Sequence, residues 1–202
     1  MQASGFVLAG GGSTRMGRNK ALLPFRGITL VEHVAGIVRE AAGSATLIGD
    51  PVQLGPLGLP VVPDKLPGFG PASGIYTALT MTSADWNLIA GCDMPAITGD
   101  ILVSLLRRAA AAPVGIDCIA AAGPDGDPEP LCAVYHRRCL PAVARAIGDN
   151  RLKMKSLLLQ LGLEILPVDA STLANVNTPA EWAEFEAKLA CPEKVICPEK
   201  VI

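Results

Sequence analysis

Short apolar runs alternate with longer segments of helical periodicity along almost the whole chain, and this alternation restricts the fold more than any other feature. Strands are expected at the apolar runs, residues 5–9, 45–48, 86–90, 118–122 and 132–135, with a weaker candidate at 164–168. Helices are expected where apolar side chains recur at helical spacing, at residues 30–42, 100–112, 140–147, 152–161 and 179–189.

Strands that alternate with helices predict an α/β protein with a mostly parallel sheet, in a Rossmann-like three-layer α/β/α arrangement. The chain of 202 residues has the size of one domain, and its 50% hydrophobic and 18% charged residues are typical of a globular core. We expect this domain to cover residues 1–190. Residues 191–202 repeat Cys-Pro-Glu-Lys-Val-Ile without change, which we interpret as a non-functional artefact of the gene end.

The net charge and the short length of the apolar runs restrict the partners and surroundings that this chain is expected to have. A net charge of −2 argues against a nucleic-acid-binding surface. No apolar run approaches the length of a membrane span and no export signal pattern is present, so we expect a cytoplasmic protein. None of the six cysteines forms a Cys-x-x-Cys pair, so neither a zinc site nor a disulfide framework is expected.

The strongest motif follows the first expected strand and reads Leu-Ala-Gly-Gly-Gly-Ser-Thr-Arg-Met-Gly-Arg-Asn-Lys over residues 8–20. The consecutive glycines at 10–12 let the backbone approach an anion closely, and Arg15 and Lys20 add charge that suits a polyphosphate. The segment is neither a Walker A loop, which needs Lys-Ser/Thr after the second glycine, nor a dinucleotide fingerprint, because Arg15 replaces its third glycine. A phosphate-binding connection of another kind is therefore predicted.

Two aspartates also follow apolar stretches. Asp93 ends the run that begins at Trp86, and a single carboxylate at a strand's carboxyl end suits Mg²⁺, although Asp-x-Pro also makes ordinary turns. Asp64 precedes a glycine- and proline-rich segment at 65–74, which suits a close approach to a base or sugar but equally a surface loop. Ligands of parallel sheets bind beyond the carboxyl ends of the strands, so both positions are candidates.

The motif at residues 8–20 resembles the signature of the nucleotidyltransferases that share the sugar-nucleotide pyrophosphorylase fold. Within that group the chain is most similar to the MobA-type molybdenum cofactor guanylyltransferases. Four further blocks carry this resemblance: Gly-Pro-x-x-Gly-Ile at 70–75, Cys-Asp-Met-Pro at 92–95, Glu-Pro-Leu-Cys-Ala-Val-Tyr at 129–135 and Asn-Val-Asn-Thr-Pro-Ala-Glu at 175–181. One departure is clear, since the usual Gly-Pro-Leu-Gly-Gly loop reads Gly-Pro-Ala-Ser-Gly at 70–74.

The resemblance implies that GTP binds to the glycine-rich segment and to two aspartates. Its nucleotide-binding residues would be Leu8, Ala9, Gly10, Gly11, Gly12, Lys20, Asp64 and Asp93. Asp93 would hold Mg²⁺ beside the phosphates, and Arg15, Lys20 and Asp93 would be the catalytic residues. Asn175 and Asn177 would lie near the acceptor or the metal.

The implied reaction is attack by the terminal phosphate of a molybdopterin-type acceptor on the α-phosphorus of GTP, which expels pyrophosphate. The acceptor is already an anion, so alignment and charge neutralisation would suffice without a strong base, and His33 and His136 are interpreted as structural. Transient contact with proteins that make or receive the cofactor is also expected. The residues alone leave three alternatives open: a CTP-dependent enzyme on the same acceptor, a sugar- or polyol-phosphate nucleotidyltransferase, and a nucleotide-binding regulator.

Overall fold

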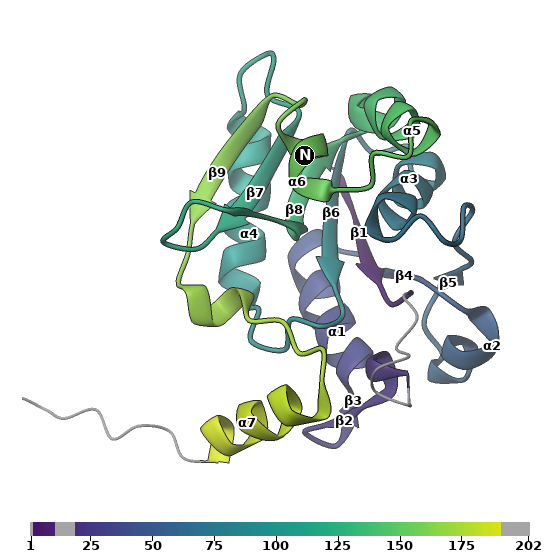
Figure 1. Ribbon diagram of the computed structural model, residues 1–202, viewed down its shortest axis with the longest axis vertical. Coiled ribbons are helices and arrows are strands. Elements are labelled where there is room, and N and C mark those ends of the chain that lie inside the picture. The colour runs from purple at the N-terminus through teal and green to yellow at the C-terminus, as the bar shows by residue number, and fades with distance from the viewer. Residues whose placement is uncertain (1, 11–18, 191–202) are drawn as a thin grey trace, which may run out of the picture.

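The computed structural model describes residues 2–10 and 19–190, apart from the side chains of 188–190, and within them a seven-stranded sheet forms the centre of the molecule (Figure 1). The strand order is β5-β4-β1-β6-β8-β7-β9. These strands are β1 (Ala3–Leu8), β4 (Thr46–Ile48), β5 (Val61–Val62), β6 (Trp86–Gly91), β7 (Cys118–Ala122), β8 (Pro128–His136) and β9 (Leu163–Pro167). Only β8 runs antiparallel to its neighbours β6 and β7, so the sheet is mostly parallel, as predicted.

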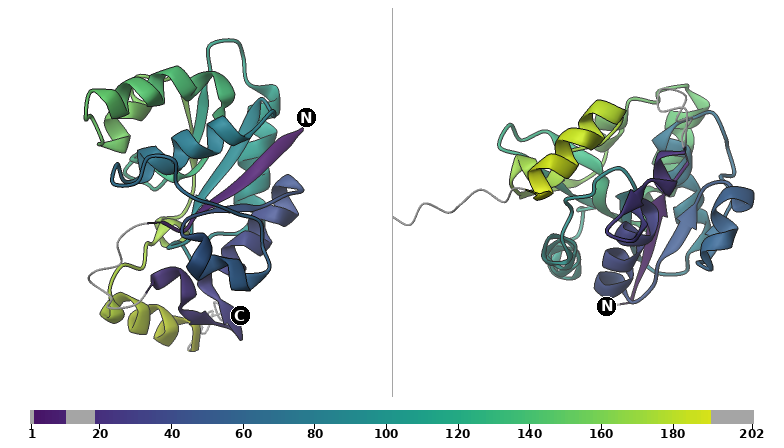
Figure 2. Two further views of the ribbon diagram at one scale, coloured as in Figure 1. Left: turned by 90° about the vertical axis from the view of Figure 1, so that its right-hand side faces the viewer. Right: turned by 90° about the horizontal axis from the view of Figure 1, so that it is seen from below.

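Helices cover both faces of the sheet (Figures 1 and 2). On one face lie α1 (Leu30–Ala42) and α4 (Gly99–Ala111), which pack on inward-facing residues such as Val7 and Leu88. On the other face lie α3 (Pro71–Met81), α5 (Leu140–Gly148) and α6 (Met154–Leu158), which pack on Phe6 and Ile89. Alternate side chains of each strand thus enter opposite core layers, and the three-layer α/β/α prediction is confirmed.

A third, smaller cluster joins the two ends of the chain. Phe25 belongs to a hairpin of β2 (Pro24–Phe25) and β3 (Ile28–Thr29), and it packs with Val176 and with Trp182 of α7 (Pro179–Ala190). Phe25 and Trp182 meet edge to face, with ring centroids 5.9 Å apart. This contact brings the segment before α7 next to the β2–β3 hairpin (Figures 1 and 2).

Local signals explain where the principal helices begin. Thr29 and Glu32 form a complete capping box at the start of α1, and Gly43 ends that helix in a left-handed conformation, with φ +78°. Thr178 accepts the Glu181 N–H while Glu181 accepts the Thr178 N–H, so α7 begins with the predicted cap. None of the helices in the described part of the chain is long and apolar enough to cross a membrane.

The structure corrects three expectations about single elements. The helix expected at 152–161 is only the five-residue α6, and residues 71–74, expected as loop, form the first turn of α3 with Pro71 at its start. The strand expected at 132–135 extends from Pro128 to His136. Short elements without a strong sequence pattern, among them α2 (Pro51–Leu54), were not expected.

Candidate functional site

The parallel strands β4, β1 and β6 end at one edge of the sheet, where their last residues are linked. The Ala9 N–H donates to the Ile48 carbonyl at 2.9 Å, and the Cys92 N–H donates to the Leu8 carbonyl at 3.1 Å. Ile48 and Leu8 end their strands, and Cys92 directly follows β6. The glycine-rich segment and Asp93 therefore leave the sheet side by side.

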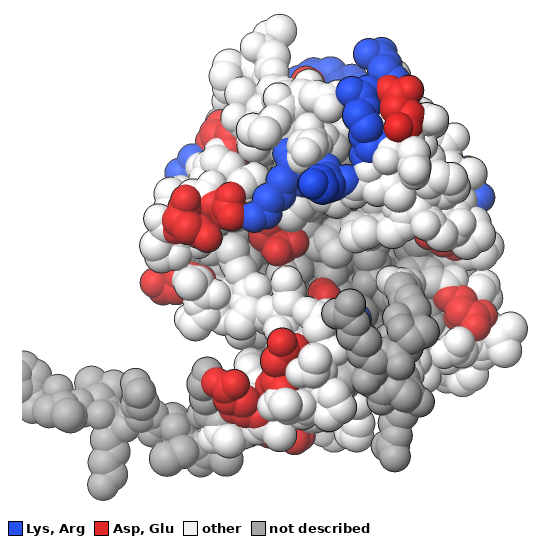
Figure 3. Space-filling view, in the orientation of Figure 1, with Lys and Arg blue, Asp and Glu red and all other residues white. Residues whose placement is uncertain are grey.

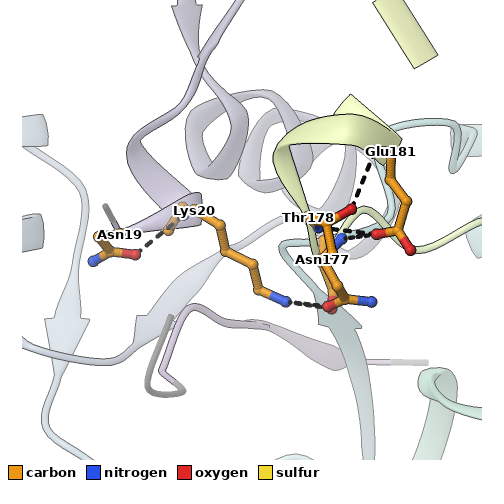
Figure 4. Close-up of polar contacts among 7 residues, drawn as sticks. Asn19, Lys20, Asn177, Thr178 and Glu181 are labelled. Carbon is orange, nitrogen blue, oxygen red and sulfur yellow. Dashed lines mark hydrogen bonds and ion pairs between the residues drawn. The ribbon is translucent and has the colours of Figure 1, made fainter. Parts of the chain in front are cut away.

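Lys20, Asp93 and Asn177 meet at this edge, although 157 residues separate the first from the last. The Lys20 ammonium lies 2.7 Å from Asp93 Oδ2. It also lies 2.9 Å from Asn177 Oδ1 (Figure 4). The side chains of Lys20 and Asp93 keep 20% and 17% exposure, so this polar corner opens to solvent. Two oxygens from distant parts of the chain thus converge on one cation.

The segment that carries the two asparagines is fixed against Asp93. The Val176 N–H donates to the Asp93 carbonyl at 2.8 Å, and the Val176 side chain is buried. Asn175 and Asn177 are exposed on either side of it. The caps of α7 are supplied by Thr178 and Glu181, so the asparagine side chains are not needed to cap that helix.

Asp64 has a different environment at the start of α3. Its Oδ1 accepts hydrogen bonds from the Ser73 hydroxyl, from the Thr77 hydroxyl at 3.2 Å and from the Leu66 N–H at 3.1 Å. Ser73 and Thr77 lie on successive turns of α3 and are fully buried. Asp64 therefore ties the segment after β5 to this helix.

Glu129 is a carboxylate near Asp93 that the sequence interpretation did not assign to the site. It lies early in β8, and its Oε1 accepts the Leu131 N–H at 3.0 Å. Burial raises the pKa of the Glu129 carboxyl, the Leu131 N–H opposes that rise, and the negative charge of Asp93 adds to it as a smaller cause. Its position in the Glu-Pro-Leu block was the only signal in the sequence.

The glycine-rich segment is described only in part. Leu8 and Ala9 are buried and use backbone groups in the sheet, whereas Gly10 is exposed beyond it. Gly11, Gly12 and Arg15 lie outside the described residues. A methyl group on Gly74 of α3 would lie 2.6 Å from a Leu8 methyl, so this glycine permits close packing of α3 on β1.

Cys92 and His33 near this edge, and His136 at the opposite edge beside Trp86, have structural environments. Burial raises the pKa of the Cys92 thiol to about 12, which argues against a thiolate nucleophile beside Asp93. His33 contacts the Pro95 carbonyl through Nε2 at 3.3 Å, and His136 Nδ1 accepts the Arg138 N–H at 3.1 Å. Both contacts agree with the structural interpretation of these histidines.

Figure 3 shows a hollow in the surface at the carboxyl-end edge of the sheet, with Lys and Arg side chains gathered above it over α5 and α6. Some of these cations are paired: Arg151 contacts Asp149, and Lys155 contacts Asp127. The face above the hollow is nevertheless more basic than the face below it (Figure 3). An anionic ligand in the hollow would meet a favourable potential on that side.

Comparison with known proteins identifies the family. The model of the MobA-like NTP transferase domain matches residues 5–164. A probable molybdenum cofactor guanylyltransferase of Deinococcus radiodurans is 35% identical over 184 residues, which cover 90% of this chain and 93% of that protein. A probable molybdenum cofactor guanylyltransferase of Mycobacterium tuberculosis is 37% identical over 184 residues, which cover 88% of this chain and 90% of that protein.

Solved structures share the fold at lower identity. Molybdopterin-guanine dinucleotide biosynthesis protein A of Archaeoglobus fulgidus superposes with a TM-score of 0.78 at 24% identity, over 93% of this chain and 98% of that one. A CMP:2-keto-3-deoxy-manno-octonic acid synthetase in complex with CTP reaches 0.75 at 15% identity, over 94% and 99%. The fold alone therefore does not determine the base. The matched family model and the curated relatives place this chain in the MobA-like NTP transferase family.

Proposed function

We propose that this protein transfers GMP from GTP to the terminal phosphate of a molybdopterin-type cofactor and releases pyrophosphate. The observation that carries the proposal is the corner in which the Lys20 ammonium lies between Asp93 Oδ2 and Asn177 Oδ1, directly beyond β1 and β6. The choice of GTP and of the acceptor rests on curated relatives at 30–37% identity that are named molybdenum cofactor guanylyltransferases.

The donor set of this corner fits a divalent cation such as Mg²⁺. Asp93 Oδ2 and Asn177 Oδ1 are both hard oxygen donors, and they already converge on a cation, the Lys20 ammonium. We expect Asp93 to hold Mg²⁺, with Asn177 as a second oxygen donor. When bound, the ion would neutralise charge on the phosphates.

The chain's own residues supply binding and alignment. The backbone of Leu8, Ala9, Gly10, Gly11 and Gly12 would follow the phosphates, while Lys20 and Arg15 would attract the leaving pyrophosphate. In the reaction an oxygen of the acceptor phosphate bonds to the α-phosphorus, and the bond from that phosphorus to the bridging oxygen breaks. The electron pair leaves with pyrophosphate, so no protein group must remove a proton.

The remaining predicted residues keep narrower roles in the proposal. Asn175 and Asn177 would contact the acceptor, because they are exposed beside Asp93 on a segment that Val176 anchors. Asp64 would contact the nucleotide through the oxygen that its α3 contacts leave available, since those contacts go to Oδ1. Transient docking of proteins that supply or receive the cofactor would use the basic face above the hollow (Figure 3).

The proposal is tested with purified full-length protein, molybdopterin, Mg²⁺ and GTP labelled at the α-phosphate. We expect the label to appear in a molybdopterin guanine dinucleotide, with one pyrophosphate released for each transfer. Labelled CTP and labelled ATP, in parallel reactions, should give much less product, because buried polar groups of a base site are left unpaired by the wrong base. Preferred transfer from CTP would instead make the protein a cytidylyltransferase. Transfer to sugar phosphates only, or to neither acceptor, would contradict the proposal.

A further inference from the structure

Two helices of this chain begin with the same signal, a threonine followed three residues later by a glutamate, but the two glutamates have different partners. At α1, Glu32 Oε2 accepts the N–H and the hydroxyl of Thr29, at 2.8 and 2.6 Å. At α7, Glu181 Oε2 accepts the Thr178 N–H at 2.9 Å and also the Asn177 N–H at 2.6 Å (Figure 4). A capping box accounts for the bond to Thr178 but not for the bond to Asn177.

The additional bond is made to the residue whose side chain completes the polar corner, since Asn177 Oδ1 lies 2.9 Å from the Lys20 ammonium. A hydrogen bond from an N–H to a carboxylate is about twice as strong as one between neutral groups. Glu181 is exposed, and the Asn177 N–H is the largest cause that lowers the pKa of its carboxyl, so the carboxylate stays ionised at neutral pH. Glu181 therefore holds the backbone of Asn177 by a charge-assisted bond.

The backbone on both sides of Asn177 is also fixed. Before it, the Val176 N–H donates to the Asp93 carbonyl at 2.8 Å. After it, the Thr178 carbonyl accepts the Trp182 N–H at 3.0 Å. Between these two anchors, rotation of the peptide at Asn177 would change the direction in which its side chain leaves the backbone. The bond that restrains this peptide is the one from the Asn177 N–H to the carboxylate.

We propose that Glu181 is a positioning residue of the polar corner, whose carboxylate fixes the Asn177 backbone so that Asn177 Oδ1 faces the Lys20 ammonium. The inference rests on the proposed function, which assigns this corner to the metal ion and the acceptor phosphate. Glu181 acts through Asn177 and does not have to touch either substrate. Loss of a helix cap would only destabilise α7, whereas loss of this positioning would also displace an oxygen donor of the corner.

The test compares Glu181→Ala with the conservative Glu181→Gln in the full-length protein. The alanine variant removes both hydrogen bonds, whereas the glutamine oxygen can still accept both N–H groups, because one oxygen of Glu181 accepts them now. At saturating GTP, transfer of GMP by Glu181→Ala should fall about 10- to 100-fold, as expected for a misplaced group. Glu181→Gln should stay within about threefold of wild type, because it keeps the hydrogen-bond geometry. The affinity for GTP without metal should change by less than about twofold in both variants.

A second measurement does not depend on transfer. Mn²⁺ serves as a probe of the corner in the nucleotide-free protein, and titration calorimetry gives its affinity. Glu181→Ala should weaken Mn²⁺ binding about as much as Asn177→Ala does. The double variant should bind Mn²⁺ no more weakly than Asn177→Ala alone, because a residue that acts through another adds nothing once the other is removed.

Two control variants separate positioning from capping. Thr178→Ala removes the hydroxyl that accepts the Glu181 N–H at 3.2 Å but leaves the bond from Asn177 to Glu181. Glu32→Ala removes the corresponding glutamate of α1. Both should lower the melting temperature, as Glu181→Ala does, because each weakens a helix start. Neither should change Mn²⁺ affinity or transfer by more than about twofold.

Three results would overturn the inference. A lowered melting temperature in Glu181→Ala with normal Mn²⁺ affinity and transfer would make Glu181 a helix cap only. An equal loss in Glu181→Gln would show that the charge acts and not the hydrogen bonds. Additive losses in the double variant would show that Glu181 does not act through Asn177.

Two further situations remain decidable. Should Glu181→Ala not fold, Glu181→Asp replaces it in every comparison, because the shorter side chain keeps the charge but withdraws from Asn177. A wild-type protein that transfers no GMP would remove the proposed function, whereas the Mn²⁺ comparison would still decide whether Glu181 positions Asn177.

Discussion

Asp93 and Asp64 follow apolar strands in the same way, yet their surroundings differ in kind. Asp93 follows β6 and meets the Lys20 ammonium and the segment before α7, which come from the two ends of the chain. Asp64 follows β5 and meets two hydroxyls of α3, the next helix along the chain. The first carboxylate gathers distant charged and amide groups that a ligand can use. The second carboxylate joins the segment after β5 to α3. An aspartate that follows an apolar strand therefore has different surroundings at the two positions.

The largest effect that we expect comes from removing the charge of Asp93. Asp93→Asn keeps the shape but loses the carboxylate that pairs with Lys20 and would hold Mg²⁺. Transfer of GMP should fall by about 100- to 1,000-fold, the range for loss of one electrostatic contact to the transition state. The rate of pyrophosphate release measures this loss of GMP transfer. Turnover equal to that of wild type would make Asp93 a turn residue and would abolish the contrast with Asp64.

Lys20→Met is expected to have the next largest effect. It should lower the rate of GMP transfer but raise the affinity for a divalent cation. Transfer should fall by about 100-fold because a cation near the phosphates is lost. Binding of Mn²⁺ to the nucleotide-free protein should tighten, because Asp93 Oδ2 and Asn177 Oδ1 are released from the ammonium. Titration calorimetry with Mn²⁺ checks the second point. Weaker Mn²⁺ binding in this variant would show that the metal does not use this corner.

Asp64→Ala should act mainly on stability. The variant removes the acceptor of the Ser73 and Thr77 hydroxyls, which are buried, so we expect a loss of about 1–3 kcal/mol in the free energy of unfolding. Turnover per folded molecule should fall only a few-fold. Urea unfolding and pyrophosphate release on the same sample separate these effects. A loss of activity as large as that of Asp93→Asn at normal stability would place Asp64 in the reaction centre.

The smallest effect that we expect is on the pH dependence of stability. It comes from His33, which packs against Phe25. Burial lowers the pKa of His33 below its ordinary value of about 6.5. As pH falls through that value, the unfolded chain takes up the proton before the folded protein does, so stability declines on the acid side. We expect a small fall in melting temperature between about pH 7 and pH 5.5, and a flatter profile in His33→Gln. Identical profiles would show that His33 does not contribute.

The fold was largely predictable because its signals are local. The apolar run at 118–122 and the helical pattern at 30–42 coincide with β7 and α1. The whole of α3 was missed because Gly70, with φ +62°, and Gly74 suggested a loop, although Pro71 at a first helical position was an available signal. The direction of β8 was also not predictable, because apolar periodicity carries no information about strand direction.

The residue pattern alone made Lys20, Asp64 and Asp93 candidates for the site, whereas Asn175 and Asn177 came only from the family resemblance. Spacing along the chain could not bring Lys20 to Asn177, because their contact depends on the packing of α7 on the β2–β3 hairpin. Glu129 was missed because Asp93, its neighbour in space, is distant in sequence. The link from Asp64 to α3 could be found only in the structure. Its partner Ser73 was expected in a loop, and no helix was expected at its partner Thr77.

The contrast between the two carboxylates is tested most directly by the increase in melting temperature that GTP causes, with and without Mg²⁺, in wild type, Asp93→Asn and Asp64→Asn. A ligand at 100 times its dissociation constant adds about 2.7 kcal/mol, so a metal-dependent gain in affinity is measurable. We predict that Mg²⁺ enlarges the GTP shift in wild type and in Asp64→Asn but not in Asp93→Asn. A magnesium-dependent shift that persists in Asp93→Asn and disappears in Asp64→Asn would contradict the account.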